Sequence, residues 1–266
     1  PRPTSESMPE PMEGRLAAVP PVTVLAGRLA EVTAVVGLYV GGSLASGDYR
    51  PGTSDLDVVA VLGRPPGVEE RRRLVALHRG LRRSGADDGQ LHCCYVSLDR
   101  VDDVALSHWT WAFDELFERP LSGIARAELL ADPVVVSGPA PSTLLPGMDE
   151  QAVRAAARDE LTGYWAGALP RRCIWLQDTY VDLALVTLAR VHVTLTESRL
   201  VTKREAIERL PEVGVPPELA DEVACRRAGG TVTLSWAARR RRARLVRALM
   251  AAGISGPAGT PPEDPR

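Results

Sequence analysis

The sequence predicts an α+β fold, in which a mixed sheet with helices is followed by an all-helical C-terminal domain. Over roughly the first 140 residues, short apolar runs typical of buried strands alternate with segments of helical periodicity. From residue 148 onward the pattern is helical throughout. Strands alternating with helices, followed by a run of helices, indicate two domains. We expect a disordered arm over 1–20, a sheet domain over 21–140, a helical domain over 148–253 and a disordered tail over 254–266.

The sheet domain is expected to begin with a helix over 22–36, where apolar residues recur near helical spacing. A second helix is expected over about 67–84, after the Pro-Pro-Gly break. Between 103 and 131 lie an aromatic cluster and an amphipathic segment. Each expected strand is an apolar run bounded by turn or polar residues. The expected strands cover 36–40, 56–62, 91–97 and 133–137.

Prolines and glycines divide the C-terminal part into separate helical segments. The proline-rich stretch 138–147 precedes them and is expected to hold the boundary between the domains. The expected helices cover 148–168, 174–198, 203–210, 216–228 and 233–252.

The composition is that of an ordinary soluble globular protein, and the net charge bears on which partners are expected. The formal net charge of −2 gives no electrostatic reason to expect nucleic acid or a membrane surface as a partner. No window approaches the roughly 18 apolar residues of a membrane span, and the first residues do not resemble a secretory signal. We expect a cytoplasmic monomer. We also expect four buried free thiols, at Cys93, Cys94, Cys173 and Cys225.

The most informative stretch joins a Gly-Gly-Ser turn to two aspartates at the start of a strand. Asp55 and Asp57 are separated by one residue, so on a strand both side chains point to the same side. Mg²⁺ is usually bound by one or two carboxylates together with substrate phosphates. Gly42 lets the backbone approach a phosphate, and Ser43 and Ser54 can add contacts. The pattern therefore predicts a phosphate and Mg²⁺ site; the alternative is a tight turn before a polar strand start.

Gly-Ser, about ten intervening residues and then Asp-x-Asp at a strand resembles the signature of the DNA polymerase β-like nucleotidyltransferases. Segments 134–139, 186–190 and 200–211 look like those of the aminoglycoside (3'')(9) adenylyltransferases, which act on streptomycin and spectinomycin. The resemblance implies a nucleotidyltransferase-type mixed sheet, Mg²⁺, and ATP as co-substrate. It also implies transfer of AMP to a hydroxyl of an aminoglycoside-like acceptor, with release of pyrophosphate.

Two cations of the C-terminal part match that family's pattern. The separation of Arg190 and Lys203 resembles that of the family's pair, which contacts the triphosphate from the helical domain. Lys203 is also the only lysine in a chain that otherwise uses arginine, and the two side chains are not interchangeable against a phosphate. The resemblance therefore implies that both bind the triphosphate; the alternative is a surface arginine and a lysine at a helix start.

His92 departs from the family, which carries a glutamate at this strand position as the general base for the acceptor hydroxyl. A neutral imidazole can accept a proton, so His92 is the candidate base. The alternative is a buried histidine in a protein whose acceptor reaction is altered or lost. The nearest carboxylates rank below it, because none lies in a strand-like run: Asp87, Asp88, Asp114 and Glu115.

The acceptor site is expected to combine aromatic and acidic side chains. Trp109 and Trp111 alternate with Phe113, and aromatic faces stack on sugars and bases; packing between the domains is the alternative. Asp178 and Asp182 are four residues apart and share a helix face, as in the family's acidic drug-binding residues. The alternative for this pair, and our expectation for the arginine run at 239–242, is a solvated helix face.

Two other functions stay open from the sequence. One is a related transferase that modifies a protein or another metabolite. The other is a nucleotide-binding protein without transferase activity, which the missing glutamate would explain.

Overall fold

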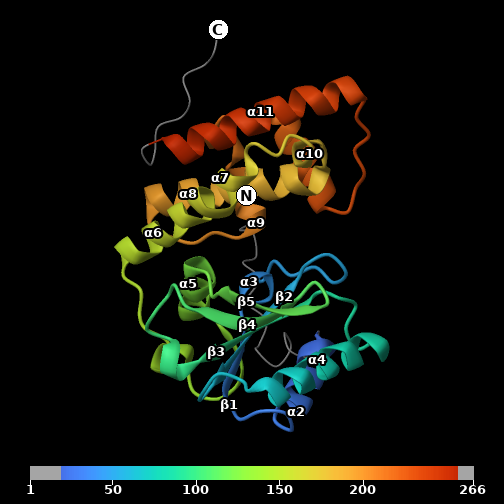
Figure 1. Cartoon of the computed structure of the whole chain (residues 1–266). Helices are drawn as coiled ribbons and strands as arrows, with labels where there is room; N and C mark the ends of the chain where they lie inside the picture. The colour runs from blue at the N-terminus through green and yellow to red at the C-terminus, as the bar shows by residue number, and fades with distance from the viewer. Residues whose placement is uncertain (1–18, 257–266) are drawn as a thin grey trace, which may run out of the picture. The chain divides into compact units, whose positions relative to one another are not determined.

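The computed structural model describes residues 19–256, and the chain divides into two compact units between Met148 and Asp149 (Figure 1). Most of the expected N-terminal arm and C-terminal tail lies outside the described residues. Their inner ends do not behave as predicted, since Val19 is buried and the last helix continues to Ser255.

The N-terminal unit is built on one six-stranded mixed sheet, as predicted. Its strand order is β5-β4-β3-β2-β1-β6. Strands β2 and β3 are parallel, whereas the other neighbouring pairs are antiparallel. The strands are β1 (Val35–Val40), β2 (Leu56–Leu62), β3 (Leu91–Ser97), β4 (Ser107–Ala112), β5 (Glu115–Pro120) and β6 (Val134–Ser137).

Helices cover both faces of this sheet (Figure 1). On one face, α2 (Pro20–Leu29) and α4 (Val68–Arg83) pack against alternate residues of β2, such as Val58 and Ala60. The residues between them, such as Val59, face the other side, where α5 (Gly123–Ala131) packs. The period of two in β2 therefore supplies both halves of the core.

The first helix is shorter than predicted. It ends at Leu29 rather than near residue 36. Val35 pairs with Leu62 as the first residue of β1. The apolar residues after α2 therefore extend the sheet, and β-branched valines fit a pleated surface better than a helix end.

The aromatic cluster forms a hairpin that the sequence did not reveal. Strands β4 and β5 are joined by Phe113 and Asp114, whose φ angles are 54° and 62°. A two-residue turn with positive φ at both positions usually carries Asn-Gly or Gly-Gly. Because Phe-Asp is an unusual choice there, the turn gave no recognisable signal.

The described part of the C-terminal unit is helical, as predicted, with small differences at the boundaries. The expected helix over 148–168 is interrupted by a π-helical turn, Leu161–Trp165. The expected helix over 174–198 begins as a 3-10 turn, Ile174–Leu176. No helix within residues 19–256 is long and apolar enough to cross a membrane. The helices are α6 (Glu150–Glu160), α7 (Ala166–Ala168), α8 (Asp178–Glu197), α9 (Lys203–Glu208), α10 (Pro217–Arg227) and α11 (Trp236–Ser255).

Two predictions about individual side chains were wrong. All four cysteines are free thiols, but Cys173 and Cys225 are exposed rather than buried. The arginine run is not wholly a solvated face, because Arg242 is buried and pairs with Asp178 at 2.5 Å and with Glu222 at 3.1 Å.

A buried histidine lies in the core of the N-terminal unit. The His78 ring stacks on Trp111, with 4.7 Å between ring centroids, and its Nε2 lies 2.6 Å from the hydroxyl of Tyr95. Burial lowers the pKa of His78 to about 3 because the charged imidazolium would lose its hydration. The core therefore requires the neutral form.

We expect His78 to make the unfolding free energy fall in acid. Above pH 6.5 the side chain is neutral in both states. As the pH falls from about 6.5 towards 3, only the unfolded chain takes up the proton. This loss should reach about 2–3 kcal/mol by pH 4. Urea unfolding at several pH values measures it, and His78→Gln, which can bond to Tyr95 but does not titrate, is the control. Equal pH slopes for both proteins would contradict the assignment.

Candidate functional site

A glycine turn brings the backbone against a carboxylate at one end of the sheet. Gly41 follows β1, and its N–H donates to the carbonyl of Asp57 at 2.9 Å. Gly42, with φ 61°, opens the short helix α3 (Gly42–Ala45). A Cβ at Gly42 would lie 2.6 Å from Asp57 Oδ2, closer than such atoms approach. Only glycine therefore lets the turn lie this close to the carboxylate.

The loop before the aspartates is fixed by Ser54. This residue is buried, its N–H donates to the carbonyl of Arg50 at 2.9 Å, and its Oγ accepts from the Arg50 N–H at 3.1 Å. Both bonds close the turn that leads into Asp55. Ser54 thus has a structural part in the loop, and its contact with phosphate stays a prediction.

Asp55 and Asp57 have the alternation that the sequence predicted. Leu56 and Val58 are buried, whereas the two aspartates are exposed, Asp57 with 54% of its side chain. Within residues 19–256 no three His, Cys, Asp or Glu side chains gather as a metal site. Two carboxylates beside a bare glycine backbone nevertheless fit Mg²⁺, which takes hard oxygen ligands and completes its shell with water and substrate phosphates.

His92 lies beside Asp57 because of the strand register. Asp57 of β2 pairs with His92 of the parallel β3, so both side chains lie on the same face of the sheet. His92 Nδ1 is 3.9 Å from Asp57 Oδ1, and the imidazole is mostly buried while the carboxylate is half exposed. A basic nitrogen and a carboxylate thus meet next to the glycine turn. The expected base position is therefore close to the aspartates.

The aromatic residues divide into core and surface. Trp111 is buried against His78, and the Arg71 guanidinium lies 4.5 Å from the Trp109 ring centroid. Both tryptophans thus pack within the N-terminal unit, on the α4 side. Phe113 is 75% exposed, and its ring centroid is 5.1 Å from that of His92. Among the three, Phe113 is the ring that lies open beside the candidate base.

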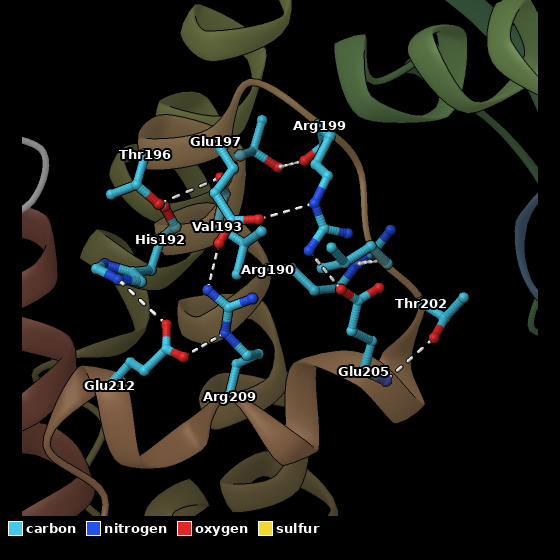
Figure 2. A network of polar contacts seen from close by, with 12 residues as sticks. Arg190, His192, Val193, Thr196, Glu197, Arg199, Thr202, Glu205, Arg209 and Glu212 are labelled. Carbon is cyan, nitrogen blue, oxygen red and sulfur yellow. Dashed lines mark hydrogen bonds and ion pairs between the residues drawn. The ribbon is translucent and has the colours of Figure 1, made fainter.

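In the C-terminal unit, Arg190 contacts the segment that leads to Lys203. Arg190 Nε donates to the carbonyl of Val201 at 3.0 Å, and Thr202 caps α9, which begins at Lys203 (Figure 2). The two cations that the sequence singled out therefore belong to neighbouring segments of this unit. Their contact with a triphosphate stays a prediction.

Asp178 and Asp182 form ion pairs with arginines of the same unit. Arg226 holds Asp182 with two hydrogen bonds of 2.8 and 2.6 Å, and Arg242 holds Asp178. Burial raises the pKa of the Asp182 carboxyl, and the bonds from Arg226 oppose that rise. These carboxylates therefore join α8 to α10 and α11, and their predicted part in acceptor binding has to compete with those ion pairs.

Comparison with known proteins gives one family match, over part of the chain. Residues 24–84 match the model of the nucleotidyltransferase domain family. Over these residues the chain is similar to nucleotidyltransferase domains. The matched range includes the glycine turn and both aspartates, but it ends before His92 and before the C-terminal unit.

The fold of the whole chain also has a counterpart among solved structures. It is similar to the crystal structure of spectinomycin adenyltransferase AAD(9) from Enterococcus faecialis with ATP and spectinomycin. The TM-score is 0.64 over 90% of this chain and 98% of that chain, at 14% sequence identity. No curated protein sequence matches the chain. The likeness shows that the two chains share a fold.

Two features of the site escaped the sequence. The exposed ring of Phe113 depends on the unrecognised turn, although its place in the aromatic alternation was a signal. The arginine partners of Asp178 and Asp182 lie 64 and 44 residues away along the chain, and no local pattern identifies them.

We expect Gly42→Ala to impair binding of Mg-ATP without unfolding the protein. The new Cβ would collide with Asp57 Oδ2, so the carboxylate must move. Gly47→Ala is the matched control, because Gly47 has a φ of 72° but open space around its Cβ position. Both variants should lose about 1 kcal/mol or more from backbone strain. Only Gly42→Ala should lose the thermal shift induced by Mg-ATP, and equal shifts in the two variants would show that the close approach does not matter.

Proposed function

We propose that the protein is an adenylyltransferase that moves AMP from Mg-ATP to a hydroxyl of a small, aminoglycoside-like acceptor in the cytoplasm. The match of residues 24–84 to the nucleotidyltransferase domain model supports the transfer of a nucleotide. The observation that carries the proposal is the meeting of Gly42, Asp57 and His92 at one end of the sheet, with 3.9 Å between imidazole nitrogen and carboxylate. In such a site the Gly42 backbone can approach a phosphate, Asp57 supplies oxygen ligands and His92 supplies a base.

Each of these residues has a distinct task in the reaction. Asp55 and Asp57 would hold Mg²⁺, which when bound neutralises charge on the triphosphate and the leaving pyrophosphate. Gly42 and Ser43 bring the backbone and a hydroxyl to the phosphates. His92 takes the proton of the acceptor hydroxyl as its oxygen bonds to the α-phosphorus. The bond from that phosphorus to the β-phosphate oxygen breaks, and pyrophosphate leaves.

Arg190 and Lys203 are our candidates for binding the triphosphate from the C-terminal unit. A guanidinium and an ammonium both oppose phosphate charge and stabilise the leaving group. The Lys203 side chain makes no hydrogen bond or ion pair within the described part of the chain. Its charge is therefore not committed to a carboxylate.

The ion pairs of Asp178 and Asp182 favour a second candidate acceptor. Because both carboxylates already bind arginines, they attract a polycationic drug less than unpaired acids would. A less cationic metabolite with a free hydroxyl is therefore the alternative substrate of the same transfer reaction.

Release of pyrophosphate tests the function directly. We expect the protein to release pyrophosphate from Mg-ATP when streptomycin, spectinomycin or a neutral polyol from an acceptor panel is present. Asp55→Asn with Asp57→Asn should lower the rate roughly a thousandfold or more, because several kcal/mol of charge stabilisation is lost. If the protein binds Mg-ATP measurably but releases pyrophosphate with none of the acceptors, the enzyme proposal is contradicted. A Mg²⁺-dependent thermal shift that persists in the double variant would contradict the metal ligands.

The part of His92 has its own test. We expect His92→Ala to lower kcat by about 10²- to 10⁴-fold, as for loss of a general base. His92→Glu should retain much of the rate and extend activity to lower pH, because a carboxylate stays deprotonated further into acid than an imidazole. Steady-state kinetics across the pH range measure both effects. If His92→Ala leaves kcat unchanged, another group accepts the proton.

A further inference from the structure

Side chains of α8 donate hydrogen bonds to the backbone of the five residues between α8 and α9. Ser198 ends α8 in the left-handed region, with φ 57°. The hydroxyl of Thr194 donates to the carbonyl of Arg199 at 3.1 Å, and Arg190 Nε donates to that of Val201 at 3.0 Å. The turn that carries Lys203 is therefore bonded to the same helix that carries Arg190.

Arg199 is the side chain that ties the two helices together across this turn. Its Nε lies 2.8 Å from Glu197, the last residue of α8, and its Nη2 lies 2.5 Å from Glu205 on α9 (Figure 2). Arg209 continues the network, since it pairs with Glu197 and Glu212. One guanidinium thus bridges two carboxylates that flank the Arg190 and Lys203 segments.

We propose that Arg199 is a positioning residue for the nucleotide, and this inference rests on the proposed function. It holds the α8–α9 turn in one geometry and neutralises Glu197 and Glu205. Without it, the carboxylate of Glu205, two residues after Lys203, is unpaired. That negative charge would oppose a triphosphate and attract the lysine ammonium that should bind it.

The exposure of these side chains argues against a purely structural role. Arg199 is 44% exposed, and Glu197 and Glu205 are 33% and 34% exposed. Ion pairs this accessible to solvent contribute little to the stability of a fold. Loss of Arg199 should therefore affect the binding of ATP more than the stability of the protein.

Steady-state kinetics and Mg-ATP titration of the full-length protein separate these effects. We expect Arg199→Ala to raise KM and Kd for ATP about tenfold, with kcat within about twofold and little change in Tm. Combining Arg199→Ala with Glu205→Gln should return KM to within about threefold of the wild type, because the carboxylate that Arg199→Ala leaves unpaired is gone while Glu197 keeps its pair with Arg209. Arg72→Ala is the control, since its 3.6 Å pair with Glu69 on α4 is more exposed, at 76% and 69%, and its loss should have no effect.

The outcomes distinguish this inference from the function on which it rests. An active wild-type enzyme whose KM for ATP is unchanged by Arg199→Ala would overturn the role of Arg199 alone. An Arg199→Ala, Glu205→Gln double variant as weak as Arg199→Ala would also overturn it, since Arg199 would then contact the nucleotide itself. A wild-type protein that neither binds nor turns over Mg-ATP would overturn the proposed function first.

Discussion

The parallel pairing of β2 with β3 is the constraint on which the candidate site depends. Leu56 N–H donates to the carbonyl of Gln90 at 2.8 Å, and from there each residue of β2 has a fixed partner. This register places His92 beside Asp57 on the face that α5 covers, while Leu56 and Cys93 point to the face that α2 and α4 cover. A slip of one residue would turn His92 to the opposite face of the sheet, away from Asp57. The same hydrophobic pattern that stabilises the sheet therefore also sets the geometry of the candidate site.

Much of the site could be predicted from the sequence, because the strand register depends on the local alternation of residues between the two faces of the sheet. The bounds of β2 and β3 agree with those predicted, since each is an apolar run flanked by turn or polar residues. The shared face of Asp55 and Asp57 follows from the same period of two. The sequence did not predict where α2 ends or that β4 and β5 form a hairpin. Valines fit helical spacing as well as a strand, and the turn at Phe113 lacks the glycine that normally marks positive φ.

Long-range charge pairing sets the limit of prediction in the C-terminal unit. Helical periodicity correctly placed Asp178 and Asp182 one turn apart on α8. It carried no information about Arg226 and Arg242, which come from helices that pack beside α8 only in the folded unit. The sequence predicted a drug-binding face at Asp178 and Asp182, but both carboxylates are paired with arginines. One of these arginines, Arg242, belongs to the run that was predicted to be solvated.

This use of arginine explains why the single lysine is informative. A guanidinium presents several donors in a plane and bridges carboxylates on different helices, as Arg199 and Arg242 both do. An ammonium is a compact point charge that bridges less well and binds a phosphate without needing a fixed plane. If arginines satisfy the carboxylates of this unit, the lysine at the start of α9 keeps its charge for an anion that arrives from solution. The carboxylate network and Lys203 are then two parts of one electrostatic arrangement, in which internal pairing leaves the ammonium available for the proposed nucleotide.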